Sequence, residues 1–167
     1  AGLAISLTVT SFPLEMARAA GNRELVDLCA GRIGCWMITH PDKGTDVGGF
    51  DMKREWVPGQ QGNKGSLLAK VSADEIVING QCSAWVSNGA VAQVALAYMS
   101  ADYGDGYFDG DGRPLGVSAI VPLDLPGVSR GKPLEKIGQR ALPQGEVFFD
   151  NVRIPKRFAI ALRDEYY

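Results

Sequence analysis

The chain has 167 residues, of which 46% are hydrophobic and 22% charged, and its formal net charge is −2. These values predict an ordinary globular chain and exclude both a disordered chain and a basic surface for nucleic acid. No apolar run reaches the ~20 residues that a transmembrane helix needs, so we expect no membrane span.

The cysteines, the histidine and the first residue bear on compartment, metals and completeness. The odd number of cysteines (Cys29, Cys35 and Cys82) and the absence of an N-glycosylation sequon favour a reducing compartment. Their spacing matches no zinc pattern, and the single histidine is His40, so we expect no metal site. The chain begins at Ala1 without a basic segment, which argues against a signal peptide and suggests a piece of a longer protein.

Residues 1–31 contain little glycine, and we expect them to be mostly helical. Within them, residues 3–9 alternate apolar with small or polar side chains, a period of two that by itself predicts a strand. Residues 14–20 predict a helix. A second short helix is expected to follow, with Asn22 as its N-cap and Gly31 as its stop.

From residue 34 onward, short apolar or β-branched runs are separated by turn residues such as Asn79-Gly80 and Pro126-Gly127. Short strands without helices between them predict an antiparallel β-barrel or orthogonal sandwich rather than a parallel sheet. The predicted fold class is therefore mainly β with a short N-terminal helical segment. The expected strands are residues 35–39, 66–71, 75–79, 84–87, 91–99, 115–121 and 147–154.

Two segments, 47–65 and 100–114, predict long surface loops, and residues 157–167 are expected to begin a helix. The acidic, glycine-rich run at 102–111 lacks the ligand order and final Glu of a calcium loop, so we expect a solvated hairpin loop there. Residues 127–131 fit the pattern G-x-S-x-G, but prolines flank them, which predicts a turn rather than the nucleophile elbow of a hydrolase.

Three stretches carry specific information when they are taken in order. The first, residues 36–47, reads Trp-Met-Ile-Thr-His-Pro-Asp-Lys-Gly-Thr-Asp-Val. The second joins Ile-Asn-Gly-Gln at 78–81 to Trp-Val-Ser-Asn-Gly at 85–89. The third runs from 126 to 155 and contains Lys-Ile-Gly-Gln-Arg at 136–140. Together they resemble the middle domain of the acyl-CoA dehydrogenase family, over roughly residues 22–160.

The chain departs from the family pattern at several positions. Trp36 stands where the family has Tyr, His40 where it has Glu, and Thr45 where it has Ser. Ser87 stands in place of Thr, and one extra residue precedes Trp85. Because Ser87 keeps the hydroxyl, its role is expected to survive. No catalytic role is assigned to His40.

The resemblance implies that the chain binds FAD and an acyl-CoA thioester. The indole of Trp85 would cover one face of the flavin, and the Ser87 hydroxyl would reach the ring near N5, because residues two apart in a strand point to one side. Thr39 and the backbone at Ile38 would bond the pyrimidine edge. The implied cofactor contacts are Trp36, Ile38, Thr39, Gly44, Thr45, Trp85 and Ser87, with Thr45 also at the substrate.

The reaction of the family is α,β-desaturation of an acyl-CoA in fatty acid metabolism. A glutamate removes the Cα proton while Cβ passes a hydride to flavin N5. Because that glutamate belongs to a C-terminal helical domain, we assign no catalytic residue to this chain and expect it to be inactive alone. The implied organisation is the end of an N-terminal helical domain at 1–31, a middle domain at 32–156 and the start of the C-terminal connection at 157–167.

The resemblance further implies an electron-transfer flavoprotein as partner, a homotetrameric parent, and a location in the bacterial cytoplasm or the mitochondrial matrix. Alternatives are a flavin oxidase or monooxygenase of the same superfamily, a non-enzymatic β-barrel binding module, and a fragment that has lost its cofactor. Taken alone, Trp85 fits a core tryptophan, and Thr39, Thr45 and His40 fit ordinary turn or loop residues. The acyl chain length and the role of residues 48–65 stay open.

Overall fold

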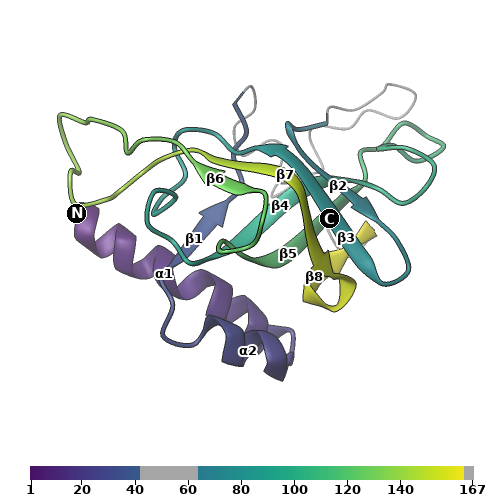
Figure 1. Cartoon of the computed structure of the whole chain (residues 1–167), viewed down its shortest axis with the longest axis horizontal. Helices are drawn as coiled ribbons and strands as arrows, with labels where there is room; N and C mark the ends of the chain where they lie inside the picture. The colour runs from purple at the N-terminus through teal and green to yellow at the C-terminus, as the bar shows by residue number, and fades with distance from the viewer. Residues whose placement is uncertain (42–63, 164–167) are drawn as a thin grey trace.

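The computed structural model describes residues 1–41 and 64–163, and in it two helices precede a sheet of short strands (Figure 1). The mainly-β prediction is confirmed. The elements are α1 (Gly2–Ala19), α2 (Arg23–Cys29), β1 (Gly34–Met37), β2 (Leu67–Val71), β3 (Glu75–Gln81), β4 (Val94–Asp102), β5 (Gly116–Pro122), β6 (Val128–Arg130), β7 (Val147–Pro155), the 3-10 helix η2 (Lys156–Phe158) and β8 (Ala159–Leu162).

The sheet is mixed rather than wholly antiparallel. Its strand order is β6-β7-β3-β2-β4-β5-β8, and β1 pairs with β4 in addition. Both β1 and β2 run parallel to β4, whereas the other pairings are antiparallel as expected. The two parallel strands share one edge of β4. Strand β1 lies opposite residues 94–97 and β2 opposite residues 100–102.

His40 fills the gap between β1 and β2 on that edge. Its ring is buried, Nδ1 accepts the N–H of Ser66 at 2.8 Å, and Nε2 lies 3.3 Å from the carbonyl oxygen of Tyr98 in β4. Because Nδ1 accepts an amide hydrogen, Nε2 carries the ring proton and donates it to Tyr98. The interpretation of His40 as an ordinary loop residue is therefore wrong: its side chain continues the backbone pairing of the sheet.

Side chains of the central strand β4 point alternately to its two faces, and an apolar cluster lies on each face. Ala95, Ala97 and Met99 face the main core inside the sheet. Val94 and Leu96 face the other side, where the two helices cover them. This burial on both sides explains why β4 and β5 are apolar almost throughout.

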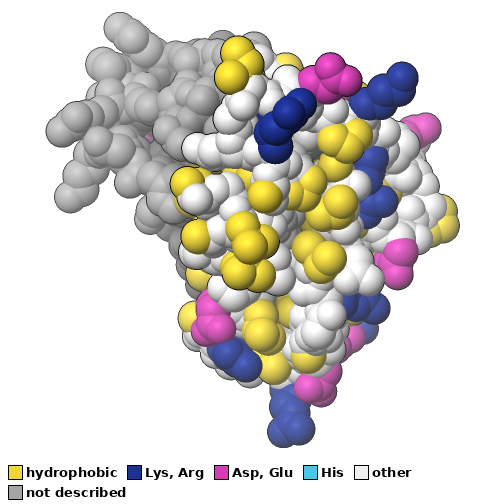
Figure 2. All heavy atoms as spheres, turned by 90° about the vertical axis from the view of Figure 1, so that its left-hand side faces the viewer, with side chains coloured by type: hydrophobic (Ala, Val, Ile, Leu, Met, Phe, Trp, Pro, Cys, Tyr) yellow, Lys and Arg dark blue, Asp and Glu magenta, His cyan; other side chains and the backbone are white. Residues whose placement is uncertain are grey.

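The strand that the two-residue alternation predicts for residues 3–9 is wrong, because they lie in α1. The buried positions of α1 include Val9, Pro13 and Ala17, which recur every four residues, while Leu3 and Leu7 are exposed on the opposite side. Figure 2 shows the face at the left of Figure 1, where apolar side chains lie among charged ones. The helical prediction for the region as a whole is confirmed.

The second helix begins as predicted. Asn22 caps α2 by accepting the N–H of Leu25 at 3.1 Å. The same side chain donates from Nδ2 to the carbonyl oxygen of Arg157 at 3.0 Å, and Arg157 pairs with Glu24 through two hydrogen bonds. The start of α2 is thereby fastened to η2.

Two local predictions are wrong and a third is confirmed. Residues 84–87 form turns rather than a strand. The expected helix from residue 157 is a single turn of 3-10 helix followed by β8, which pairs with β5. In the segment 126–131, a turn leads directly into β6, so no strand-to-helix elbow forms there, as predicted.

The acidic loop between β4 and β5 turns its carboxylates on its own backbone. Asp102 accepts the N–H groups of Gly104 and Gly106, and Asp109 accepts those of Asp111 and Arg113. The hairpin-loop prediction is confirmed. Across residues 1–41 and 64–163, no group of three metal-ligating side chains occurs, and no helix there is both long and apolar enough to cross a membrane.

Candidate functional site

Thr39 of the first motif touches Ser83, which lies between the two parts of the second motif. Their hydroxyl oxygens lie 2.5 Å apart, and the N–H of Ser83 donates to the carbonyl oxygen of Thr39 at 3.0 Å. The structure therefore brings together two segments that are 44 residues apart in the chain.

Trp85 projects from this contact into solvent. Its backbone N–H donates to the hydroxyl oxygen of Ser83 at 3.2 Å, while 64% of the residue surface is exposed. The interpretation of Trp85 as a core tryptophan is wrong. A tryptophan held by its backbone and bare on its ring is suited to stacking on a flat ligand.

Ser87 lies in the turns that follow Trp85, so the argument that both point to one side because they share a strand does not hold. Ser87 is half-buried, and its hydroxyl has no hydrogen-bond partner in the described part of the chain. The hydroxyl is free to bind a ligand, but no strand geometry directs it.

Residues of the third motif hold the turn that carries Trp85 in place through hydrogen bonds. Gln144 donates from Nε2 to the carbonyl oxygen of Trp85 at 2.9 Å. Lys136 in turn donates to Gln144 Oε1 at 2.8 Å and to the carbonyl oxygen of Leu142 at 2.6 Å. The motif residue Lys136 therefore positions the backbone that carries the exposed indole.

Asn88 and Gly89 of the second motif have structural roles. Asn88 is fully buried with a φ of 64°, a conformation that asparagine tolerates better than most residues. A side chain on Gly89 would collide with the carbonyl oxygen of Gly145, so only glycine allows the third motif to approach this closely.

Trp36 lies apart from this contact, on the helix-facing side of the sheet. Its ring packs edge-on against Phe12 of α1, with centroids 5.1 Å apart. It lines an apolar cavity of about 260 Å³ together with Phe12, Met16, Leu96 and Tyr98. The structure thus places Trp36 at an open apolar cavity on the helix-facing side of the sheet.

The other expected cofactor contacts divide into two groups. Ile38 is buried, so its backbone rather than its side chain is the part available for a polar ligand. Gly44 and Thr45 lie outside the described residues.

Ser83 is the residue that the sequence analysis missed. It is buried and bonded to both Thr39 and Trp85. The signal that could have found it is the extra residue before Trp85, because an insertion beside a motif has to be accommodated by new local contacts.

The arrangement offers an exposed indole and two hydroxyl groups on adjacent turns. It fits a flat aromatic ligand with a polar edge. Among the described residues, no Asp or Glu hydrogen-bonds to Thr39, Ser83, Trp85 or Ser87.

Comparison with known proteins connects this chain to a family. Residues 35–152 match the family described as "Acyl-CoA dehydrogenase, middle domain". A glutaryl-CoA dehydrogenase of Desulfococcus multivorans is 35% identical over 124 residues, which cover 74% of this chain and 26% of the relative. The human mitochondrial short-chain specific acyl-CoA dehydrogenase is 30% identical over 129 residues, 75% of this chain and 25% of that protein.

Solved structures give the same picture. The glutaryl-CoA dehydrogenase of Mycobacterium smegmatis in complex with FADH2 is 26% identical, with a TM-score of 0.66 over 96% of this chain and 36% of that one. A glutaryl-coenzyme A dehydrogenase in complex with glutaryl-CoA is 26% identical, with a TM-score of 0.70 over 98% and 37%. The chain spans about a quarter of the length of the curated relatives that it matches.

Proposed function

The chain belongs to the acyl-CoA dehydrogenase family, and we propose that it is the flavin- and thioester-binding part of a larger dehydrogenase. The observation that carries the proposal is the contact of Thr39 with Ser83, from which the exposed indole of Trp85 projects. An aromatic wall beside fixed hydroxyl groups is what the ring and the pyrimidine edge of a flavin require.

FAD supplies the hydride acceptor of the reaction when it is bound. Trp85 covers one ring face, and the Ser87 hydroxyl donates near N5. Thr39 and the backbone at Ile38 bind the pyrimidine edge, while Ser83 orients the Thr39 hydroxyl. Trp36, Gly44 and Thr45 are the further cofactor contacts in this proposal, with Thr45 also contacting the acyl-CoA thioester.

The desaturation of an acyl-CoA needs a base to remove the Cα proton. The proposal places that base outside this chain, in a C-terminal helical domain, with residues 1–31 as the end of an N-terminal helical domain. An electron-transfer flavoprotein as electron acceptor, a homotetrameric parent and a bacterial cytoplasmic or mitochondrial matrix location belong to the same proposal.

The test is the flavin content of the purified full-length protein and of matched variants. The wild-type protein should be yellow and release FAD on denaturation. Trp85→Leu should weaken FAD binding about tenfold, because the stacking surface is lost. Ile137→Leu alters another exposed apolar residue, one outside the site, and should bind FAD like the wild type.

A colourless full-length protein would favour the binding-module alternative. Equal FAD affinity of the wild type and Trp85→Leu would show that Trp85 does not contribute to flavin binding. The 167-residue chain by itself should show no turnover of any acyl-CoA. Steady-state turnover by it would place the base within this chain.

A further inference from the structure

A second cavity lies at the far end of β2 from the Thr39–Ser83 contact. Its volume is about 400 Å³. Ser83 lies two residues beyond the end of β3. The cavity is reached at Val71, the last residue of β2, which pairs with Ile76 near the start of β3. The cavity is therefore separate from the proposed flavin site, and ligand binding at one does not require binding at the other.

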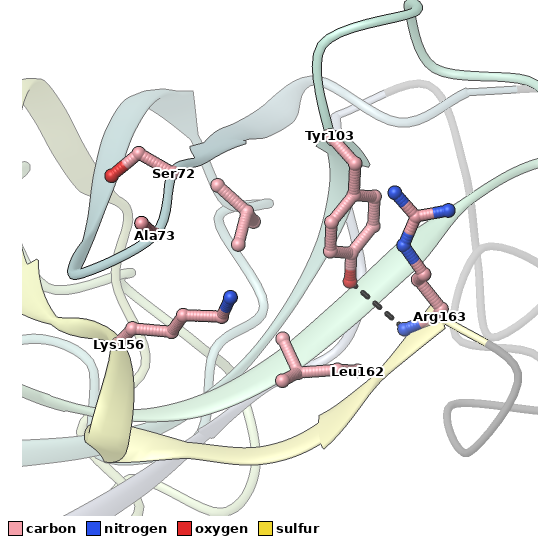
Figure 3. A pocket seen from close by; sticks show the side chains of 7 residues that line it. Ser72, Ala73, Tyr103, Lys156, Leu162 and Arg163 are labelled. Carbon is pink, nitrogen blue, oxygen red and sulfur yellow. Dashed lines mark hydrogen bonds between the residues drawn. The ribbon is translucent and has the colours of Figure 1, made fainter.

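Lys156 supplies one cationic group of the cavity (Figure 3). Its backbone N–H donates to the carbonyl oxygen of Asp74 at 2.8 Å, which fixes the residue at the start of η2. Its half-buried side chain extends into the cavity, and the amine has no hydrogen bond or ion pair with residues 1–41 or 64–163. A partly desolvated ammonium group without a protein partner is suited to binding an anion.

Arg163, at the end of β8, supplies the second cationic group. Its guanidinium lies 4.3 Å from the ring centroid of Tyr103, and its backbone N–H donates to the Tyr103 hydroxyl at 2.8 Å. That hydroxyl donates in turn to the carbonyl oxygen of Gly116 at 2.8 Å. Tyr103 thereby holds Arg163 at the rim, while the guanidinium has no carboxylate partner in the described residues.

The backbone at Arg163 has a φ of 46°, in the left-handed region that a long side chain rarely adopts. Such a conformation persists only where the surrounding contacts impose it. Here the two contacts with Tyr103 do so, and Figure 3 shows the guanidinium beside the ring of Tyr103.

The rest of the lining is neutral. Val71, Ala73 and Leu162 are apolar, Ser72 adds a hydroxyl, and none of the described Asp or Glu residues lines the cavity. Two positive charges without a lining carboxylate match a dianion better than a monoanion. The volume is in the range of pockets that hold small organic ligands.

We propose that this cavity binds a phosphate monoester with a small apolar body. Arg163 contributes the planar fork that matches phosphate oxygens, and Lys156 contributes a point charge. A phosphate monoester carries close to two negative charges at neutral pH, whereas a carboxylate carries one. The apolar wall then receives the organic part.

Phenyl phosphate is the probe, and its binding to the full-length protein is measured by titration calorimetry. Lys156→Gln and Arg163→Gln should each weaken binding about tenfold or more, because each removes a charged donor. Lys156→Arg should retain most of the affinity. Lys132→Gln removes an exposed charge away from the cavity and should leave binding unchanged.

Benzoate has the same ring with a single charge and should bind about tenfold or more weakly than phenyl phosphate. Equal affinity for the two probes would overturn the assignment to a dianion. No binding of phenyl phosphate, or binding that neither Lys156→Gln nor Arg163→Gln changes, would overturn the site itself. Unaltered FAD content in these variants would keep either result separate from the flavin proposal.

Discussion

The hydroxyl pair of Thr39 and Ser83 determines which hydrogen bonds the proposed flavin site can make with a ligand. A hydroxyl has one hydrogen to donate and two lone pairs to accept with. The Ser83 oxygen already accepts the N–H of Trp85, and its own hydrogen can go to Thr39 Oγ1. Thr39 then keeps its hydrogen for an acceptor on the ligand.

Ser83→Ala removes this orientation and should weaken FAD binding by the full-length protein about fivefold, equivalent to one hydrogen bond of about 1 kcal/mol. Flavin fluorescence titration measures the affinity, and the visible absorption spectrum of the bound flavin should shift because Thr39 turns. Ser83→Thr keeps the hydroxyl and should restore both properties. Ser129→Ala, on exposed strand β6, serves as the control. Unchanged affinity and spectrum in Ser83→Ala would contradict the role.

Motif order identified Thr39 and Trp85 in the sequence, and the structure brings their surroundings together. The extra residue before Trp85 marks the segment of Ser83, but it does not identify Thr39 as the partner, which is 44 residues away. The expected direction of Ser87 failed for another reason. It rested on strand periodicity, while turn chemistry and support from Gln144 shape this segment.

At the scale of elements, Asn88 joins three segments that the sequence keeps apart. Its Nδ2 donates to the carbonyl oxygens of Ser6 at 2.9 Å and Gly34 at 3.0 Å, and lies 3.1 Å from the Thr10 hydroxyl oxygen. Its Oδ1 accepts the hydroxyl of Ser6 at 2.7 Å. One side chain therefore links α1, β1 and the turns of the second motif.

Asn88→Asp should lower the free energy of unfolding by about 3 kcal/mol, because it removes the donors and places a carboxylate against buried carbonyl oxygens. Urea denaturation measures the loss. Asn88→Gly keeps the backbone free to adopt the positive φ but loses every hydrogen bond, so it should also destabilise. The surface change Asn79→Asp should cost less than about 1 kcal/mol. A stable Asn88→Gly would mean that conformation alone explains this residue.

The predictions of helices and strands were correct where apolar side chains mark the buried face of the element. They failed where small or polar side chains occupy that face. In α1 the small and polar residues at Ser6, Thr10 and Pro13 face the sheet, while Leu3 and Leu7 face outward, so hydrophobicity alone gave the wrong period. Strand β6, only three residues long, was missed, and the residues of β8 were assigned instead to a helix beginning at residue 157. Parallel pairing of β1 and β2 with β4 is a long-range choice that strand patterns do not encode.

At the scale of the whole molecule, the burial of the three cysteines shows that the fold excludes water from its interior. All three are buried and free. Burial raises the pKa of Cys29 to about 11, and burial raises the pKa values of Cys35 and Cys82 above their ordinary range as well. The native state therefore holds thiol protons that the unfolded chain releases above roughly pH 8.5.

Stability should consequently be complete below pH 8 and fall as pH rises toward 10, because the unfolded state then binds fewer protons than the native state. The expected loss is about 2 kcal/mol per thiol at pH 10. Urea denaturation at pH 8 and pH 10 measures it. In Cys82→Ala the difference between the two pH values should shrink by about a third, since one of three thiols is gone. An identical pH dependence in wild type and variant would contradict this origin.

The close approach of α1 to β1 determines where the chain can be divided. A side chain on Gly34 would collide with Thr10 and Pro13, so helix and strand meet backbone to backbone there. A truncated polypeptide starting at residue 32 would expose Val94 and Leu96 to water and deprive Asn88 of its partners on the helix. A protease that nicks the connection near residue 31 should leave both pieces associated, and the helices and the sheet should melt in a single cooperative transition.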